Sequence, residues 1–167
     1  MTKETIVLAG GCFWGMQELF RKIPGVLETE VGYAGGDTSN PNYEAVSSET
    51  TGHAESIKLV FDADSVSLKE ILNHFFMLHD PTTVNKQGND IGTRYRSAIF
   101  TESDKQQEVA QERIQAWDKS QQWPKPIVTE VAPLTSFTKA EEYHQDYLQK
   151  HPSGYTCHFM RKMIAPE

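Results

Sequence analysis

The 167 residues make up one ordinary domain by length, and a chain of this size buries enough surface for a core without disulfide or metal staples. Sixteen Lys and Arg against 23 Asp and Glu give a net charge of −7, which excludes a global electrostatic footprint for nucleic acid or an anionic membrane. No apolar run reaches the roughly 18 residues of a membrane span, and no signal-peptide pattern is present. We therefore expect a single cytoplasmic domain over residues 1–167, with a tail at 151–167.

The hydrophobic pattern predicts strands and helices that alternate along the chain. Residues 67–79 give the clearest signal, because Ser67 and Glu70 form a capping box ahead of one apolar stripe of helical spacing. In chain order we predict a strand at 6–9, a helix at 13–23, strands at 26–33 and 55–61, a helix at 67–79, a strand at 95–100, a helix from 103, a strand at 127–131 and a last helix from 138.

This order is βαββαβ followed by a helix, a strand, a helix and an irregular tail. It predicts the α/β (α+β) fold class: a two-layer sandwich with a ferredoxin-like core, in which helices cover one face of a mostly antiparallel sheet. Residues 37–42 and 81–93 are rich in turn-forming and polar side chains, so we expect loops there.

Two cysteines, Cys12 and Cys157, lie 157 − 12 = 145 positions apart. In a reducing compartment such a pair is more often catalytic or simply buried than a structural disulfide. The chain has no C-x-x-C, no H-E-x-x-H and no pair of histidines at i, i+4, so we expect no zinc site.

Cys12 follows a Gly-Gly pair at the predicted start of a helix. Unpaired N–H groups and the helix dipole at such a position favour a thiolate, so we expect a lowered pKa. The alternative is a small buried core residue, and the spacing alone does not decide between the two. Phe13 lies on the apolar stripe of this helix, whereas Trp14 points about 100° away from it and would suit an aromatic wall beside a nucleophile. The glycines match neither a dinucleotide-binding fingerprint nor a P-loop.

The Gly-Cys-Phe-Trp-Gly run at residues 11–15 resembles the signature of the A-type peptide methionine sulfoxide reductases. Further blocks resemble that family in the same order, at residues 31–36, 42–44, 52–55, 79–82, 87–97 and 140–145. The resemblance extends over roughly residues 6–155 and implies a two-layer α/β sandwich around a ferredoxin-like core. That fold agrees with the order of elements predicted from the hydrophobic pattern.

The resemblance implies that the Cys12 thiolate attacks the sulfur of methionine (S)-sulfoxide, in proteins or as the free amino acid, in repair of oxidative damage. It places the acid that protonates the sulfoxide oxygen at Glu55, the hydroxyl donors at Tyr43 and Tyr95, and a supporting acidic group at Asp90. A carboxyl that donates at neutral pH needs a raised pKa, which burial among aromatic side chains supplies.

The same resemblance assigns the aromatic pair and the second cysteine. Phe13 and Trp14 would hold the ε-methyl group, so that only one epimer fits. Cys157 would condense with the sulfenic acid of Cys12 to a disulfide, which thioredoxin reduces, with no metal, flavin or nicotinamide cofactor. Thr156 separates Cys157 from the Gly-Tyr pair, unlike the commonest family pattern, and no third cysteine exists. The alternative is a packed tail cysteine, with the sulfenic acid reduced by an outside thiol.

Two other functions remain open from the residues. A cysteine hydrolase or acyl transferase would pair Cys12 with a histidine such as His53, and a non-catalytic module would bind oxidised methionine in peptides. We expect His53 and His79 to be structural hydrogen-bonding residues or supports of the site, and we expect a monomer.

Overall fold

The computed structural model describes residues 1–37 and 41–167. Residues 38–40 of the predicted loop at 37–42 therefore lie outside the described residues. The strands are β1 (Lys3–Gly10), β2 (Val26–Ala34), β3 (Ala54–Asp62), β4 (Lys86–Gln87), β5 (Asp90–Ile91), β6 (Ser97–Thr101), β7 (Glu130–Pro133) and β8 (Phe137–Lys139). The helices are α1 (Phe13–Phe20), α2 (Tyr43–Ser47), α3 (Leu68–Leu78), α4 (Asp104–Ser120) and α5 (Tyr147–Lys150), with single 3-10 turns η1 (Thr93–Tyr95) and η2 (Glu142–His144).

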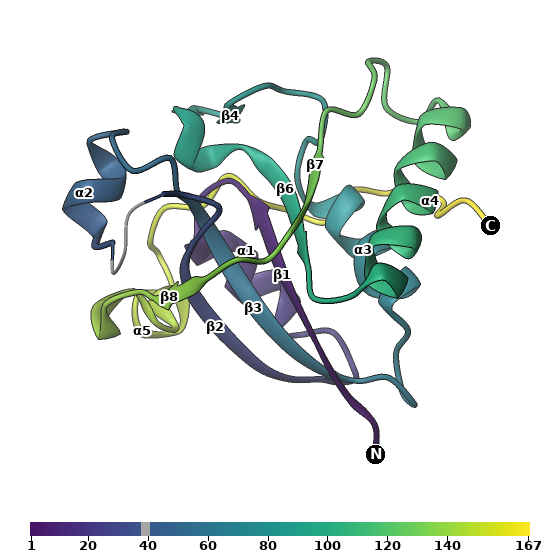
Figure 1. Ribbon diagram of the computed structural model, residues 1–167, viewed down its shortest axis with the longest axis horizontal. Helices are drawn as coiled ribbons and strands as arrows, with labels where there is room; N and C mark the ends of the chain where they lie inside the picture. The colour runs from purple at the N-terminus through teal and green to yellow at the C-terminus, as the bar shows by residue number, and fades with distance from the viewer. Residues whose placement is uncertain (38–40) are drawn as a thin grey trace.

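One twisted sheet organises the chain in the order β7-β6-β1-β3-β2-β8, as Figure 1 shows. The four inner strands, β6, β1, β3 and β2, are antiparallel neighbours and come from the βαββαβ part of the chain. This arrangement confirms the predicted ferredoxin-like core. β7 adds to one edge parallel to β6, and β8 adds to the other edge antiparallel to β2.

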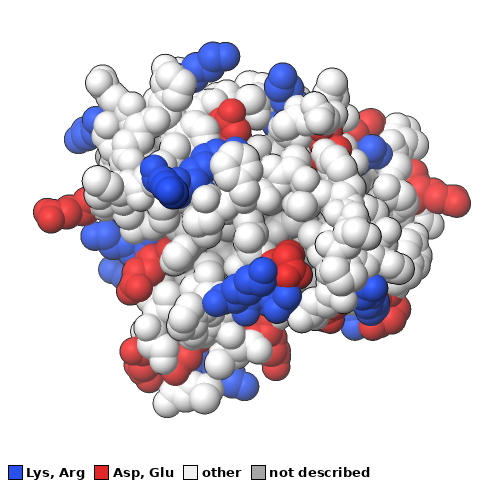
Figure 2. Space-filling view, turned by 180° about the vertical axis from the view of Figure 1, so that it is seen from behind, with Lys and Arg blue, Asp and Glu red and all other residues white. Residues whose placement is uncertain are grey.

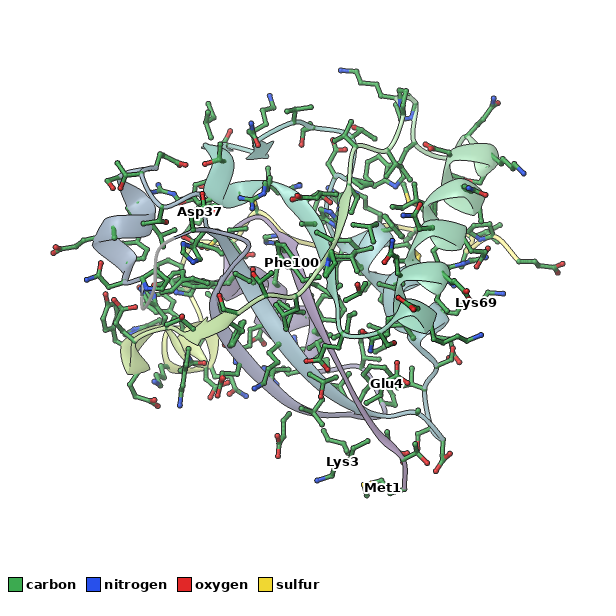
Figure 3. The ribbon with its side chains drawn as sticks, viewed as in Figure 1. Met1, Lys3, Glu4, Asp37, Lys69 and Phe100 are labelled. Atoms are coloured by element: carbon green, nitrogen blue, oxygen red, sulfur yellow. The ribbon has the colours of Figure 1, made fainter. Side chains whose placement is uncertain are left out.

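The two faces of the sheet are covered differently. The main core lies between one face and helices α1, α3 and α4, and it contains the buried side chains of Leu8, Met16, Leu59, Phe75 and Trp117 among others. The other face carries small residues and Phe100, over which Leu134 and Phe137 pack. Leu134 follows β7 and Phe137 begins β8, and this stretch of chain crosses the front of the sheet in Figure 1; Figure 3 labels Phe100 close to it. The predicted one-sided helical layer is therefore confirmed.

Helix boundaries follow from side-chain caps that the sequence shows. The Ser67 hydroxyl accepts a hydrogen bond from the Glu70 N–H at 3.1 Å, and the Glu70 carboxylate accepts from the Ser67 N–H at 3.4 Å, which confirms the capping box. Ser103 caps α4 in the same way through the Gln106 N–H. Asn42 caps the short helix α2, which our sequence analysis did not predict.

The predicted helix from residue 138 is wrong. Instead, Phe137–Lys139 pair with β2, and the chain then makes the turn η2 before the four residues of α5. The Gln145 side chain donates to the Val31 carbonyl at 2.9 Å and accepts from its N–H at 3.0 Å. These contacts with the edge of the sheet outweigh the local helical pattern. The predicted strands at 95–100 and 127–131 are also shifted, because β6 begins at Ser97 and β7 at Glu130.

The C-terminal residues run along α3 and α4, anchored by a fully buried arginine. Arg113 donates to the carbonyl of Pro166 at 2.8 Å, to the terminal oxygen of Glu167 at 3.0 Å, and to the Asn73 side-chain oxygen at 3.0 Å. The Trp117 indole N–H donates to the same Asn73 oxygen at 3.0 Å. Asn73 therefore joins α3, α4 and the tail in one polar cluster. No helix among the described residues is long and apolar enough to span a membrane.

We predict that Asn73→Ala lowers the free energy of unfolding by about 2 kcal/mol, because it removes one acceptor of the Arg113 guanidinium and leaves the buried Trp117 indole N–H without its partner. Urea unfolding followed by circular dichroism measures the change. Lys69→Ala, on the exposed side of the same helix and labelled in Figure 3, is the control and should change stability by less than about 0.5 kcal/mol. Equal stability of the two variants would contradict this account of the cluster.

Candidate active site

The strand directions bring the candidate residues together at the edge of the sheet that is formed by the strand ends, not at the sides formed by β7 and β8. β1 and β2 end at this edge, whereas the antiparallel strands β3 and β6 begin there. The chain therefore brings three parts to the same place: Cys12 just after β1, the start of β3, and the turn before β6. Figure 3 labels Asp37 near this edge and Met1, Lys3 and Glu4 at the opposite end of β1.

Cys12 is the N-cap residue of α1 and is buried, with 8% of its surface exposed. It follows Gly11, whose φ of +100° suits glycine and turns the chain from strand into helix. Burial raises the pKa of the Cys12 thiol, and the nearby Glu55 and Asp90 carboxyls raise it further, while a hydrogen bond from the Trp14 backbone N–H acts in the opposite direction. The predicted lowering of this pKa is therefore wrong: loss of solvation outweighs the helix terminus.

Glu55 is the buried acid of the site. It continues the inward-facing alternation of Ile57, Leu59 and Phe61 on β3, so its side chain lies on the helix-covered face, and it is only 2% exposed. Its Oε1 accepts from the Phe13 backbone N–H at 3.2 Å, directly after Cys12 in the chain. Burial raises the pKa of Glu55 to about 8, against the opposing effects of the Phe13 N–H and Arg94. The predicted raised pKa is confirmed, and the carboxyl is mostly protonated at neutral pH.

Trp14 is held in one orientation by two residues that our sequence analysis missed. Its indole N–H donates to His144 Nδ1 at 3.0 Å, and its ring stacks on Tyr147 with centroids 3.8 Å apart and planes at 8°. Phe13 is buried against Tyr33, with ring centroids 5.8 Å apart, so most of its surface serves the core. Of the predicted aromatic pair, Trp14 is thus the half-exposed member. His144 lies in the block at 140–145 and Tyr147 just after it. They are so far from Trp14 along the chain that no local sequence pattern indicates these contacts.

Glu141 ties the α2 region to the sheet beside this aromatic group. Its carboxylate accepts from the Tyr33 hydroxyl at 2.8 Å and from the Tyr43 backbone N–H at 3.0 Å. The Tyr43 ring lies 4.7 Å from the His144 ring, centroid to centroid, and is half-buried. The structure therefore places Tyr43 next to the histidine that orients Trp14.

Tyr95 lies in the turn η1 just before β6 and is 8% exposed. The Arg94 guanidinium stacks over its ring at 4.6 Å. Burial raises the pKa of the Tyr95 hydroxyl, and the nearby Glu55 carboxyl raises it further. Tyr95 thus keeps its proton and stays a hydrogen-bond donor near Glu55, as predicted for a group that binds a developing oxyanion.

The tail brings Cys157 to the same edge as a free, half-buried thiol. The adjacent His158 side chain hydrogen-bonds through Nε2 to the Gly10 carbonyl at 2.7 Å, two residues before Cys12. A Cβ built on Gly15 would collide with the His158 ring and lie 2.5 Å from the Thr156 hydroxyl. One on Gly11 would lie 2.6 Å from the Gln87 side chain and 3.2 Å from His158. The glycines around Cys12 therefore leave room for the tail.

Asp90 lies on β5 beside the C-terminal tail. Its Oδ2 accepts from the Cys157 thiol at 3.8 Å and from the Tyr155 hydroxyl at 3.3 Å, so its direct partners come from the tail. Burial raises the pKa of Asp90. The carboxyl still lies close enough to influence the pKa of both Cys12 and Glu55. Asp90 therefore contacts Cys157 directly and acts on Cys12 and Glu55 through its charge.

Two histidines from the sequence analysis lie outside this constellation. His79 is fully buried, with a pKa lowered to about 3 by burial, and its Nε2 bonds to the Ser97 hydroxyl at 2.8 Å. It is a structural hydrogen-bonding residue, as expected. Burial also lowers the pKa of His53, and its charged neighbours are Arg96 and Asp37. Among residues 1–37 and 41–167, no group of three or more His, Cys, Asp or Glu side chains is placed to hold a metal ion.

The surface seen from behind gives no sign of a polyanion-binding face. Figure 2 shows Lys and Arg side chains in small separate groups, interspersed with Asp and Glu, and broad uncharged areas lie between them. This distribution agrees with the net charge of −7.

Comparison with known proteins places this geometry in a family. The sequence model described as peptide methionine sulfoxide reductase matches residues 4–166. The peptide methionine sulfoxide reductase MsrA of Pseudomonas fluorescens is 51% identical over 164 residues, which are 98% of this chain and 77% of that protein.

Two solved structures of Mxr1 from Saccharomyces cerevisiae are also similar. The reduced form has a TM-score of 0.91 and 37% identity, over 96% of this chain and 93% of that one. A complex of Mxr1 with Trx2 has a TM-score of 0.67 and 26% identity, over 96% and 91%. The match of sequence and the match of fold agree with each other, and the chain belongs to the peptide methionine sulfoxide reductase family.

Proposed function

We propose that this protein reduces the S epimer of methionine sulfoxide, in proteins and as the free amino acid, and so repairs oxidative damage. One observation carries the proposal. The Glu55 carboxyl accepts a hydrogen bond from the backbone N–H of Phe13, the residue directly after Cys12. A sulfoxide bound there would meet a thiol and an acid together.

The chemistry follows from these positions. Cys12 Sγ attacks the sulfoxide sulfur as Glu55 donates its proton to the sulfoxide oxygen, and Tyr43 and Tyr95 supply hydroxyl donors for the charge that develops on that oxygen. The thiol proton restores the Glu55 carboxyl, and the oxygen then transfers from the methionine sulfur to Cys12 Sγ. The transient bond between the two sulfurs and the S–O bond to methionine both break, so that methionine leaves and Cys12 becomes a sulfenic acid. Phe13 and Trp14 would hold the ε-methyl group. The fixed plane of Trp14 supports selection of one epimer, because the other would direct its oxygen at the rings.

The first test follows the S and R epimers of an N-blocked methionine sulfoxide separately, with dithiothreitol as reductant. We predict that only the S epimer is consumed and that Cys12→Ser abolishes turnover, because serine lacks the nucleophilic sulfur. Turnover retained by Cys12→Ser would refute the assignment. If neither epimer disappears and activated esters give a burst of acyl-enzyme instead, the protein is an acyl transferase. If neither disappears but sulfoxide peptides bind, it is a binding module.

A second prediction concerns Glu55. Its replacement by Gln should slow the first turnover by roughly 10²- to 10⁴-fold, because the amide cannot supply a proton. Since the acid form is the active one and the pKa of Glu55 is about 8, the rate of the wild-type first turnover should fall as pH rises through 8. Glu55→Gln should lack this fall, since its side chain does not titrate. Rapid-quench measurement of methionine release gives both quantities, and an alkaline fall shared by the variant would exclude Glu55 as its source.

Cys157 is the thiol that we propose resolves the sulfenic acid. The tail is held beside Cys12 by His158, and the Cys157 thiol is close enough to influence the pKa of Cys12. Condensation gives a disulfide and water, and an external dithiol reduces the disulfide. The yeast relative captured with Trx2 supports thioredoxin as that reductant. Because turnover consumes reduced dithiol, we also propose that the protein works in the cytoplasm. We further propose that it acts as a monomer.

We predict that Cys157→Ser releases close to one equivalent of methionine per enzyme and then stalls when thioredoxin is the only reductant. The sulfenic acid then has no partner with which to form the disulfide that thioredoxin attacks. The measurement compares the burst of methionine with the steady rate, and normal cycling would show that another thiol resolves Cys12.

Gly15→Ala tests the same resolving step by disturbing the position of the tail that contains Cys157. Its methyl group would meet Thr156 and His158, so the variant should keep the burst and lose most of the steady rate, although Gly→Ala in a helix otherwise stabilises. Gln111→Ala, on the exposed face of α4 and remote from the tail, is the control and should leave both the burst and the steady rate unchanged.

A further inference from the structure

The Cys157 thiol lies in a small polar cradle formed by Asp90 and Gln87. Its Sγ is 3.8 Å from Asp90 Oδ2 and 3.9 Å from the Gln87 carbonyl oxygen. The Tyr155 hydroxyl, two residues earlier in the tail, donates to the same Asp90 oxygen at 3.3 Å. The carboxylate therefore faces the sulfur that must become the second nucleophile.

The cradle is built on a short hairpin, so its carboxylate has a defined position. β4 and β5 pair through Lys86 with Ile91 and Gln87 with Asp90. Gln87 is buried, and its side-chain amide bonds to the backbone N–H and carbonyl of Asp80, each at 2.8 Å. Gly88 makes the turn with φ of +57°, and a Cβ on it would lie 3.3 Å from Cys157 Cβ. The hairpin is thus shaped to receive the cysteine.

Resting on the proposed reductase function, we propose that Asp90 is the base that takes the proton of the Cys157 thiol as Cys157 attacks the sulfenic acid of Cys12. In this step the S–S bond forms and the S–O bond of the sulfenic acid breaks. The thiol proton passes to Asp90 and from there to the departing hydroxide, which leaves as water, so the carboxylate is regenerated. No oxidant is needed, because the sulfenic acid already carries the oxidising equivalent.

Without a base this step would be slow at neutral pH. The thiolate is the nucleophile in disulfide formation, and burial raises the pKa of Cys157, with Asp90 raising it further. The thiol therefore keeps its proton until something removes it during attack. Asp90 is hydrogen-bonded to that proton, and it also lies close enough to raise the pKa of Cys12. Its contact with Cys157 places a proton acceptor on the sulfur that must attack.

His158 is the competing base, since its Nδ1 lies 3.9 Å from Cys157 Sγ. Its Nε2 must carry the ring proton, because that atom bonds to the Gly10 carbonyl. Taking up a second proton would create a buried cation near Arg161, and burial lowers the pKa of His158 to about 4. Protonation of Asp90 instead removes a charge, and burial favours it despite Arg94 and the Tyr155 hydroxyl. The carboxylate is the better acceptor.

The experiment is a single turnover without reductant that follows methionine release and loss of free thiols in the same quenched samples. In Asp90→Asn we expect disulfide formation to be slower than in the wild type by roughly 10²-fold, with the Cys12 sulfenic acid accumulating and captured by dimedone. Asp104→Asn, at the exposed start of α4, is the matched control and should leave both steps unchanged. Disulfide formation at the wild-type rate in Asp90→Asn would overturn the proposal.

Two further measurements keep the test decisive. If Asp90→Asn also blocks methionine release, one equivalent of hydrogen peroxide generates the sulfenic acid directly, and the rate of the following disulfide step is compared as before. Tyr155→Phe keeps the carboxylate and should slow that step by less than about tenfold; a larger loss than in Asp90→Asn would assign the proton transfer to the phenol. A wild type that releases no methionine would refute the proposed function, whereas normal methionine release with an unaffected Asp90→Asn refutes only the role of Asp90.

Discussion

The site depends on the burial of one carboxyl group. Glu55 is 2% exposed on a strand whose other inward-facing residues are Ile57, Leu59 and Phe61. A carboxylate in such surroundings is disfavoured, so the group remains protonated well above its ordinary pKa. The same burial places Cys12 in an environment that opposes charge, and the Glu55 carboxyl makes ionisation of Cys12 harder still. The free protein therefore stores a neutral acid next to a neutral thiol, and a bound sulfoxide provides the polar partner that both lack.

Much of this arrangement can be predicted from the sequence. The capping box at Ser67, the alternation on β3 and the order of elements are local signals, and they suffice for the βαββαβ core and for the two strand ends where Cys12 and Glu55 meet. The raised pKa of Glu55 follows from the same alternation, because a carboxyl that continues an apolar face must be buried.

Other parts depend on contacts between distant residues and could not be predicted in this way. His144 and Tyr147 orient Trp14 from 130 or more positions away, and the segment that contains them departs from its helical pattern because Gln145 binds the edge of β2. The sign of the Cys12 pKa shift was wrong for a related reason: the helix terminus is visible in the sequence, but the desolvation that outweighs it is a property of the packed site. Likewise, the partners of Asp90 come from the tail, which has no periodic pattern to place it.

The C-terminal tail has a mechanical consequence through its anchors. Downstream of Cys157 it is fixed at three levels: His158 on Gly10, the Arg161 backbone N–H on the Met77 carbonyl, and the last two residues on Arg113. A segment fixed on one side of the reactive cysteine can move only from the other side. Any displacement that carries Cys157 toward Cys12 must therefore come from backbone rotations in residues 151–156. These residues follow the short helix α5 and include Gly154. The effective tether of the second thiol is then a few residues rather than the whole tail, and this short reach raises its local concentration at the first thiol.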